Sequence, residues 1–172
     1  VITGGLESNL GEGIYIAFSK LGALSRGDCR PFSPDADGIT HGEGAVCFAL
    51  KRLVDAVEQG DNILGVIHCD GASDGRSASL FEPTSEGQMR AFKNVYGETV
   101  PKLDYIEAHA TGTQVGDKTE LNSIDKFFDQ HKTYIGSSKA VFGHTKGAAG
   151  ATSLLKSLQI IRHRAIPPSP RI

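Results

Sequence analysis

The chain has 172 residues, of which 39% are hydrophobic and 22% are charged, and its formal net charge at pH 7 is −2. These values are ordinary for one folded domain with a hydrophobic core, and they argue against intrinsic disorder. The small net charge gives no long-range attraction to nucleic acid, and no apolar run approaches the ~20 residues of a membrane-spanning helix. We therefore expect neither nucleic acid nor a membrane as a partner, and no signal peptide.

Helix-like and strand-like segments alternate along the chain. In chain order, the patterns predict a strand at residues 1–5, a helix at 13–24, a loop at 28–38, a strand at 44–50, a helix at 53–59 closed by Gly60, a strand at 63–69, a helix at 85–96 capped by Thr84 or Ser85, a strand at 103–106, a helix at 119–128, a strand at 133–136 and a helix at 148–163. This alternation predicts an α/β fold with a mostly parallel sheet covered by helices on both faces.

Three of these helices carry an apolar stripe that we expect to face the core. The stripes are Met89, Phe92 and Val95; Leu121, Ile124, Phe127 and Phe128; and Leu154, Leu155, Leu158 and Ile161.

Two histidines follow predicted strands and stand beside glycine or other small residues. His109 lies in the run EAHATGT, and His144 lies in KAVFGH just before a predicted helix. Two imidazoles at two strand ends can stabilise negative charge on one carbonyl oxygen, and a helix N-terminus beside His144 would lower its pKa and keep the ring neutral. The structural alternatives are a hydrogen bond from His109 to its turn and a helix cap by His144.

Lys139 follows a predicted strand, and Asp117 and Glu120 stand at the start of a predicted helix. A partly buried ion pair between Lys139 and these acids could hold the imidazoles in place. Helix-dipole stabilisation of the two acids is the simpler alternative.

The three cysteines, Cys29, Cys47 and Cys69, are too few and too irregularly spaced for a disulfide framework or a structural zinc site. We therefore expect a reducing cytoplasm. Cys47 and Cys69 fall in apolar strands and are expected in the core, while Cys29 lies in a loop between Arg26 and Arg30. None of the three sits in a strand-to-helix elbow of the kind that exposes a catalytic thiol. A metal site built from His109, His144 and Asp117 matches no common ligand spacing.

Five stretches of the chain together carry a family resemblance. They are CRPFSPDADG at 29–38, HGEGA at 41–45, EAHATGT at 107–113, GDKTE at 116–120 and GSSKAVFGHTKGAAG at 136–150. With these stretches the chain resembles the β-ketoacyl synthase domain of polyketide and fatty acid synthases, a branch of the thiolase-like superfamily. The resemblance implies part of a layered α-β-α-β-α fold, with residues 1–78 ending the N-terminal half and residues 79–172 forming most of the C-terminal half.

The resemblance also implies decarboxylative Claisen condensation. His109 and His144 match the histidines that bind the thioester carbonyl of a malonyl-type extender and stabilise its enolate. Lys139 matches the family lysine, and Glu120 matches the acid that pairs with it. Phe142 matches an apolar residue beside the pocket. The resemblance implies supporting roles for Asp117, Thr111 and Thr113. The resemblance implies no protein-bound cofactor or metal, because phosphopantetheine arrives on the carrier protein, and it implies acyl carrier protein and a second copy of the chain as partners.

The chain departs from the family in four ways. One of them is that the glycine-rich segment that follows the proline-rich stretch in the family, with its pocket phenylalanine, is missing. The nucleophilic cysteine elbow, which in the family precedes the segment matching residues 1–5, is not in this sequence, so we expect an internal fragment that is inactive alone. Ala110 replaces a commoner glycine, and residues 140–142 replace a commoner Ser-Asn-Ile.

The alternative function is that of a non-catalytic partner subunit of the chain-length-factor type. Because both histidines and Lys139 are present, the catalytic interpretation is favoured over that alternative and over a thiolase- or chalcone-synthase-like relative.

Overall fold

Helices and short strands stack in successive layers in the computed structural model, which describes residues 1–68, 71–72, 76–77, 82–128 and 132–170. The elements in chain order are β1 (Ile2–Glu7), α1 (Glu12–Lys20), β2 (Gly44–Ala49), α2 (Leu53–Glu58), α3 (Ser85–Tyr96), β3 (Tyr105–Glu107), α4 (Gln114–Phe128), β4 (Tyr134–Gly136), α5 (Lys139–Phe142), the 3-10 turn η1 (Lys146–Ala148) and α6 (Ala149–His163).

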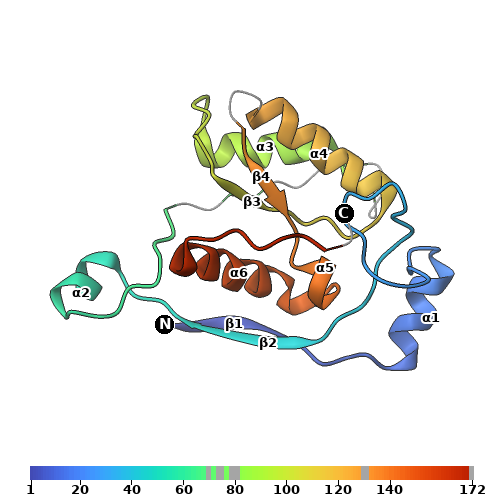
Figure 1. Ribbon diagram of the computed structural model, residues 1–172, viewed down its shortest axis with the longest axis horizontal. Coiled ribbons are helices and arrows are strands. Elements are labelled where there is room, and N and C mark those ends of the chain that lie inside the picture. The colour runs from blue at the N-terminus through green and yellow to red at the C-terminus, as the bar shows by residue number, and fades with distance from the viewer. Residues whose placement is uncertain (69–70, 73–75, 78–81, 129–131, 171–172) are drawn as a thin grey trace.

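The four strands form two separate pairs. β1 and β2 are antiparallel, with Ile2 opposite Ala49, whereas β3 and β4 are parallel, with Tyr105 opposite Tyr134. Figure 1 shows α6 between the two pairs and α3 and α4 beyond β3 and β4, so helical and sheet layers alternate. The prediction of one mostly parallel sheet is wrong for the described residues, because their strands form two separate two-stranded sheets and only the β3–β4 sheet is parallel.

The predicted strand at 63–69 is not a strand over residues 63–68, and Cys69 lies outside the described residues. Residues 63–68 are exposed, and Gly65 lies so close to α6 that a Cβ on it would be 2.6 Å from Leu158. A strand needs a neighbour that accepts and donates its backbone hydrogen bonds. No described strand lies in a pairing position, so the apolar sequence alone does not make a strand here.

The predicted helices all exist; α3 has the predicted bounds, and the other four have shifted ends. α1 stops at Lys20, just before Gly22 with φ of +64°, and α2 ends before Gly60, as predicted. Thr84 caps α3 through its hydroxyl, which accepts the backbone N–H of Gly87 at 3.1 Å. α4 begins five residues earlier than predicted, at Gln114, so Asp117 lies in its first turn and Glu120 in its second.

An aromatic cluster lies between α3 and α4. Phe92 and Tyr96 contact Phe127 and Phe128, with ring centroids 5.2–6.1 Å apart. Phe127 and Phe128 are buried, as their stripe predicted. Apolar pairs of this kind hold α3 and α4 together over the β3–β4 layer.

Other apolar positions do not reach the interior. Leu121 is 37% exposed, Leu155 is 38% exposed and Ile161 is 60% exposed, so the predicted inward stripes of α4 and α6 are only partly buried. Cys47, predicted in the core, is exposed because α6 covers only the face of β2 that carries Val46 and Phe48. A strand alternates its side chains between two faces, and here only one face has a helix against it.

Large apolar side chains are therefore exposed over β1, α2 and residues 63–67. They include Ile2, Leu6, Leu53, Val54, Val57, Leu64 and Ile67. Exposed apolar side chains in this number favour association with another apolar surface. Within the described residues, no helix is both long enough and apolar enough to span a membrane.

We predict that the 172-residue chain self-associates in dilute buffer, and that Val54→Lys or Val57→Lys reduces this association. Both valines are exposed on α2, so a charge there stays hydrated while it interrupts the apolar surface. Size-exclusion chromatography with light scattering measures the effect. Ala56→Lys on the same helix is the matched control, because Ala56 is buried and the substitution should not improve solubility. A monodisperse wild-type chain that unfolds cooperatively would contradict the prediction.

Candidate active site

The parallel pairing of β3 and β4 brings the two histidine motifs to one edge of the structure. Glu107, opposite Gly136, is the last residue of β3, and the backbone N–H of Ala108 donates to the carbonyl of Gly136 at 2.8 Å. The loops that carry His109 and His144 both start from this edge. The two imidazole rings face each other edge to face, with centroids 5.2 Å apart and planes at 85°.

The tautomer of His144 is set by the backbone beside it. The N–H of Lys146 donates to Nδ1 of His144 at 3.1 Å, so Nδ1 carries the lone pair. In a neutral imidazole the proton is then on Nε2, which can donate one hydrogen bond to a substrate oxygen. This contact also gives a hydrogen-bond acceptor to the first amide of η1. His144 can therefore cap η1, as the structural alternative expected, and still direct its Nε2 proton toward a substrate.

His144 is neutral at physiological pH. Burial, followed by the positive potential from His109, Lys139, Lys146 and His41, lowers its pKa from 6.5 to about 4. The direction is the one predicted from sequence. Desolvation is the first cause, whereas the prediction relied on a helix N-terminus.

His109 is also held neutral, although its side chain is accessible to solvent. Burial of its surroundings and the charge of Lys139 lower the pKa of His109, and Asp117 opposes them. Among the described residues, no protein group hydrogen-bonds to its ring, so the predicted structural bond to the turn is absent there. The ring is therefore available to an incoming group beside His144.

Glu120 fixes the backbone of the His109 loop. Its two carboxylate oxygens accept the N–H groups of His109 and Ala110, both at 2.7 Å. Ala110 is buried and has a φ of +26°, a conformation that glycine adopts more readily. The two charge-assisted hydrogen bonds keep this strained residue, and His109 before it, in one position.

Asp117 acts in the same way on the other side of the turn. Its Oδ2 accepts the N–H of Phe32 at 2.8 Å and its Oδ1 the N–H of Gly112 at 3.2 Å. Burial raises the pKa of Asp117 despite these hydrogen bonds. Asp117 thus ties the proline-rich loop before β2 to the His109 turn.

The predicted ion pair of Lys139 with Asp117 or Glu120 is wrong for the described residues, where no contact within 4.0 Å joins them. Both acids use their oxygens on backbone amides. Lys139 is 2% exposed, and burial lowers its pKa, while the nearby charge of Glu107 and then of Glu120 opposes the shift. Its influence on the imidazoles is therefore through space.

The remaining predicted residues take mainly structural positions. The hydroxyls of Thr111 and Thr113 lie 3.2 Å apart within the turn. Cys29 is buried and its thiol donates to the carbonyl of Thr111 at 3.5 Å, so this cysteine supports the turn. Phe142 ends α5 and is 57% exposed, next along the chain to Gly143 and His144.

A third carboxylate, Glu107, is part of the site's framework and was not predicted from sequence as a site residue. It accepts the backbone N–H of Ser138, accepts the hydroxyl of Tyr105, and pairs with Lys156 of α6 at 2.8 Å. Lys156 lies 5.3 Å from the Tyr105 ring centroid. Burial and Glu107 raise the pKa of Tyr105. The position of Glu107 at the start of the motif EAHATGT could have marked it as a site residue. Nothing in the sequence indicates that Lys156 pairs with it.

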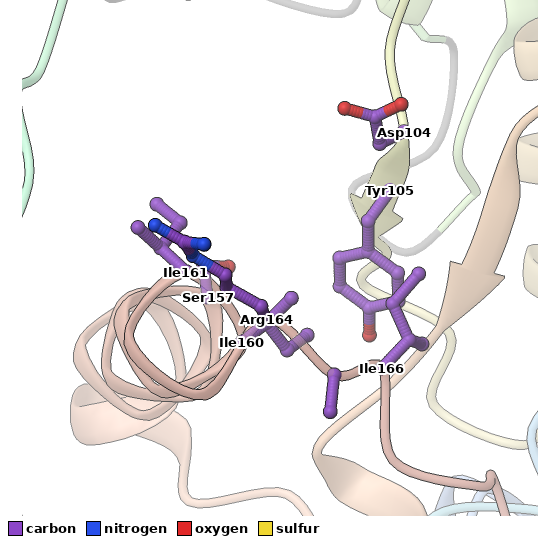
Figure 2. Close-up of a pocket in the computed structure, with 8 residues that line it drawn as sticks. Asp104, Tyr105, Ser157, Ile160, Ile161, Arg164 and Ile166 are labelled. Carbon is purple, nitrogen blue, oxygen red and sulfur yellow. The ribbon is translucent and has the colours of Figure 1, made fainter.

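A hollow of about 490 Å³ lies apart from the histidines, between the end of α6 and the start of β3. Figure 2 shows Tyr105 pointing toward Ile166 in the segment after α6, with Ile160 and Arg164 on the helix side. No predicted site residue lines this hollow. Over the part of the chain that the structure describes, no group of three His, Cys, Asp or Glu residues is placed to bind a metal ion.

Glu120→Ala should loosen the His109 loop by about 2–4 kcal/mol, because two backbone amides lose a charged acceptor. Hydrogen exchange of residues 107–113 measures this local stability. Glu120→Gln keeps one acceptor oxygen and should fall between wild type and alanine. Asp125→Ala, at an exposed position of the same helix, should change exchange by no more than about 0.5 kcal/mol. Unchanged exchange in Glu120→Ala would show that the two hydrogen bonds do not hold the loop.

Acidification should destabilise the fold between pH 6.5 and about 4, because the folded-state pKa of His144 lies below its unfolded value. Above pH 6.5 the ring is neutral in both states. As the pH falls, the unfolded state binds the proton first, so stability declines until the folded pKa is passed. Thermal unfolding from pH 7 to pH 4 measures this slope, which His144→Gln should reduce. An equal slope in wild type and variant would contradict the assignment.

Comparison with known proteins identifies the relatives of this chain. Residues 1–56 match the family described as "Beta-ketoacyl synthase, N-terminal domain", and residues 64–172 match "Beta-ketoacyl synthase, C-terminal domain". The predicted division at residues 78 and 79 stays a prediction.

Curated relatives agree with this match. Triacetic acid lactone synthase cle1 of Aspergillus versicolor is 42% identical over 84% of the chain and 9% of its own length. The non-reducing polyketide synthase pks12 of Talaromyces marneffei is 39% identical over 97% of the chain and 10% of its own length. The chain thus spans about a tenth of the length of these relatives.

Solved structures show the same fold. The ketosynthase from module 6 of the bacillaene synthase of Bacillus subtilis 168 superposes with a TM-score of 0.91 at 32% identity, covering 99% of this chain and 32% of that one. The ishigamide ketosynthase/chain length factor gives a TM-score of 0.86 at 29% identity, covering 98% of this chain and 42% of that one. The predicted partial thiolase-like fold is confirmed, and the chain belongs to the β-ketoacyl synthase family.

Proposed function

We propose that this chain is part of a β-ketoacyl synthase that elongates acyl chains by decarboxylative Claisen condensation with a malonyl-type extender. The observation that carries the proposal is the pair of neutral imidazoles whose rings lie 5.2 Å apart, with the His144 proton on Nε2. Two neutral N–H donors on adjoining loops suit one substrate oxygen that gains negative charge during the reaction.

In the proposed mechanism, the extender's thioester carbonyl lies between His109 and His144. The bond to the carboxylate carbon breaks, CO2 leaves, and the electron pair forms an enolate whose oxygen accepts both imidazole N–H groups. The α-carbon then attacks the carbonyl of an acyl thioester; a carbon–carbon bond forms and the thiolate leaves. Neither histidine needs to change its protonation state, which fits their lowered pKa values.

Lys139 supports this arrangement by its charge. It lowers the pKa of both His109 and His144, so it favours imidazole over imidazolium at both positions. Glu120 and Asp117 are positioning residues, since each holds backbone amides of the His109 turn. In this arrangement the imidazoles are the hydrogen-bond donors to the reacting group, and the acids hold the backbone of the loop that carries His109.

The acyl-accepting thiol would come from a part of a longer ketosynthase outside these 172 residues. Of the two cysteines that the structure describes, Cys29 is buried against Thr111 and Cys47 is on the outer face of β2, so neither is placed beside the two imidazoles; Cys69 lies outside the described residues. The proposed partners are an acyl carrier protein, which brings the thioesters on phosphopantetheine, and a second ketosynthase copy. A cytoplasmic location and inactivity of the isolated chain are parts of the same proposal.

A non-catalytic, chain-length-factor-type role is the second candidate, because two of the superposed structures are ketosynthase/chain length factor proteins. The catalytic role is favoured by the retained pair of imidazoles and Lys139. The residue that stands at the nucleophile position of the longer protein separates the two: cysteine supports the enzyme, and glutamine or glycine the non-catalytic role.

The direct test uses the longer protein with malonyl-carrier protein and an acyl donor, following CO2 release and product mass. His109→Ala and His144→Ala should each lower condensation by about 10²–10³-fold, because each removes one donor to the enolate oxygen. His163→Ala, at the exposed far end of α6, should keep wild-type activity. CO2 release without condensation would indicate the non-catalytic role, and no CO2 from the wild type would overturn the proposal.

A further inference from the structure

A third histidine, His41, is buried between aromatic rings just before β2. It is 6% exposed, and its ring packs edge to face against Tyr15 and Phe18 of α1, with centroids 5.1 and 4.4 Å away. Among the described residues, neither Nδ1 nor Nε2 of His41 has a hydrogen-bond partner. Leaving two buried polar atoms unpaired costs about 1–3 kcal/mol each, and the packing of the ring against Tyr15 and Phe18 has to offset this cost.

The backbone around His41 is joined directly to the backbone of His144. The N–H of His144 donates to the carbonyl of Thr40 at 2.7 Å, and the N–H of Gly42 donates to the carbonyl of His144 at 3.1 Å. These hydrogen bonds make His41 and His144 a parallel bridge pair. His144 is thus held by the segment 40–42 on one side and by the Lys146 amide on its ring.

The contact between the two segments leaves no room for side chains. A Cβ on Gly42 would lie 1.9 Å from the carbonyl oxygen of Phe142, and a Cβ on Gly143 would lie 2.9 Å from the carbonyl oxygens of Thr40 and His41. Gly143 also has a φ of +71°. Because the two backbones are in such close contact, residues 40–42 cannot shift without moving His144.

We propose that Tyr15, Phe18 and His41 form an aromatic anchor that positions His144 for catalysis. The anchor fixes residues 40–42 against α1, and the backbone bridge carries that fixed position to the imidazole of His144. This inference rests on the proposed ketosynthase function and adds His41 as a positioning residue to it. The anchor works through packing, so its aromatic shape is needed and its ring nitrogens are not.

The charges around His41 suit a neutral, packed ring. The charged or titratable groups that face it are Lys146 of η1, Glu7 of β1 and His144; Tyr15 and Phe18 of α1 provide the ring contacts. Lys146 and Glu7 lie 3.7 Å apart, so their charges largely offset one another. Burial is the first cause that lowers the pKa of His41.

The test compares His41→Ala with His41→Phe in the longer ketosynthase. We expect His41→Ala to lower kcat at least about tenfold while KM for malonyl-carrier protein changes less than about twofold, because the misaligned His144 loses a hydrogen bond that is stronger to the developing enolate oxygen than to the ground-state carbonyl. His41→Phe should restore kcat to within about threefold of wild type, since Tyr15 and Phe18 are half-buried and can shift to admit the larger ring. The ¹⁵N spectrum of His144 should show Nδ1 as a fixed acceptor in wild type and His41→Phe, and a mixture of tautomers in His41→Ala.

Phe92→Ala is the matched control, because it removes an aromatic ring from the α3–α4 cluster and should leave the His144 spectrum and kcat unchanged. The spectrum separates this inference from the proposed function: a wild type without CO2 release would refute the function, while the spectrum still tests the anchor. An unchanged His144 spectrum in His41→Ala would overturn the anchor. Equal loss of kcat in His41→Phe and His41→Ala would also overturn it, since the nitrogens would then be required.

Discussion

The parallel pairing of β3 with β4 is the constraint on which the site depends. Parallel strands end at the same edge, so the loops after Glu107 and Gly136 have to start side by side although they lie about thirty residues apart in the chain. The hydrogen bond from Ala108 to Gly136 extends this register by one residue beyond the strands. A shift of that register would move His109 away from His144.

Around this edge, acids hold the backbone of the loops, which fits the proposal that the histidines bind substrate. Glu120, Asp117 and Glu107 each accept main-chain amides of the loops, so the loops are fixed without using an imidazole as a structural hydrogen-bond donor. Burial is the first cause that lowers the pKa of both imidazoles, and the charge of Lys139, buried nearby, adds to it. An oxyanion site requires donors that do not reorganise during the reaction, and backbone fixation provides that stability.

The second support of His144 comes from a distant part of the chain. Residues 40–42 reach it by main-chain hydrogen bonds, and α1 holds those residues through rings packed on His41. The β1–β2 pair and η1 lie beside the same region, so the N-terminal part of the chain contributes to the position of a C-terminal histidine. Residues from both matched family regions therefore contribute to the position of His144.

The sequence by itself determined which segments are helical and which residues have the right chemistry. Periodicity and capping are local, so α1 to α4 and α6, the Thr84 cap and the Gly60 stop could be predicted, as could the lowered pKa of His144. Only the tertiary structure decided what depends on neighbours: residues 63–68 are not a strand because no described strand pairs with them, and Cys47 is exposed because β2 has a helix on one face. It also decided that Glu120 accepts backbone N–H groups and does not pair with Lys139, and that the segment around His41 supports the backbone of His144. Spacing in the sequence does not encode which of these groups meet once the chain has folded.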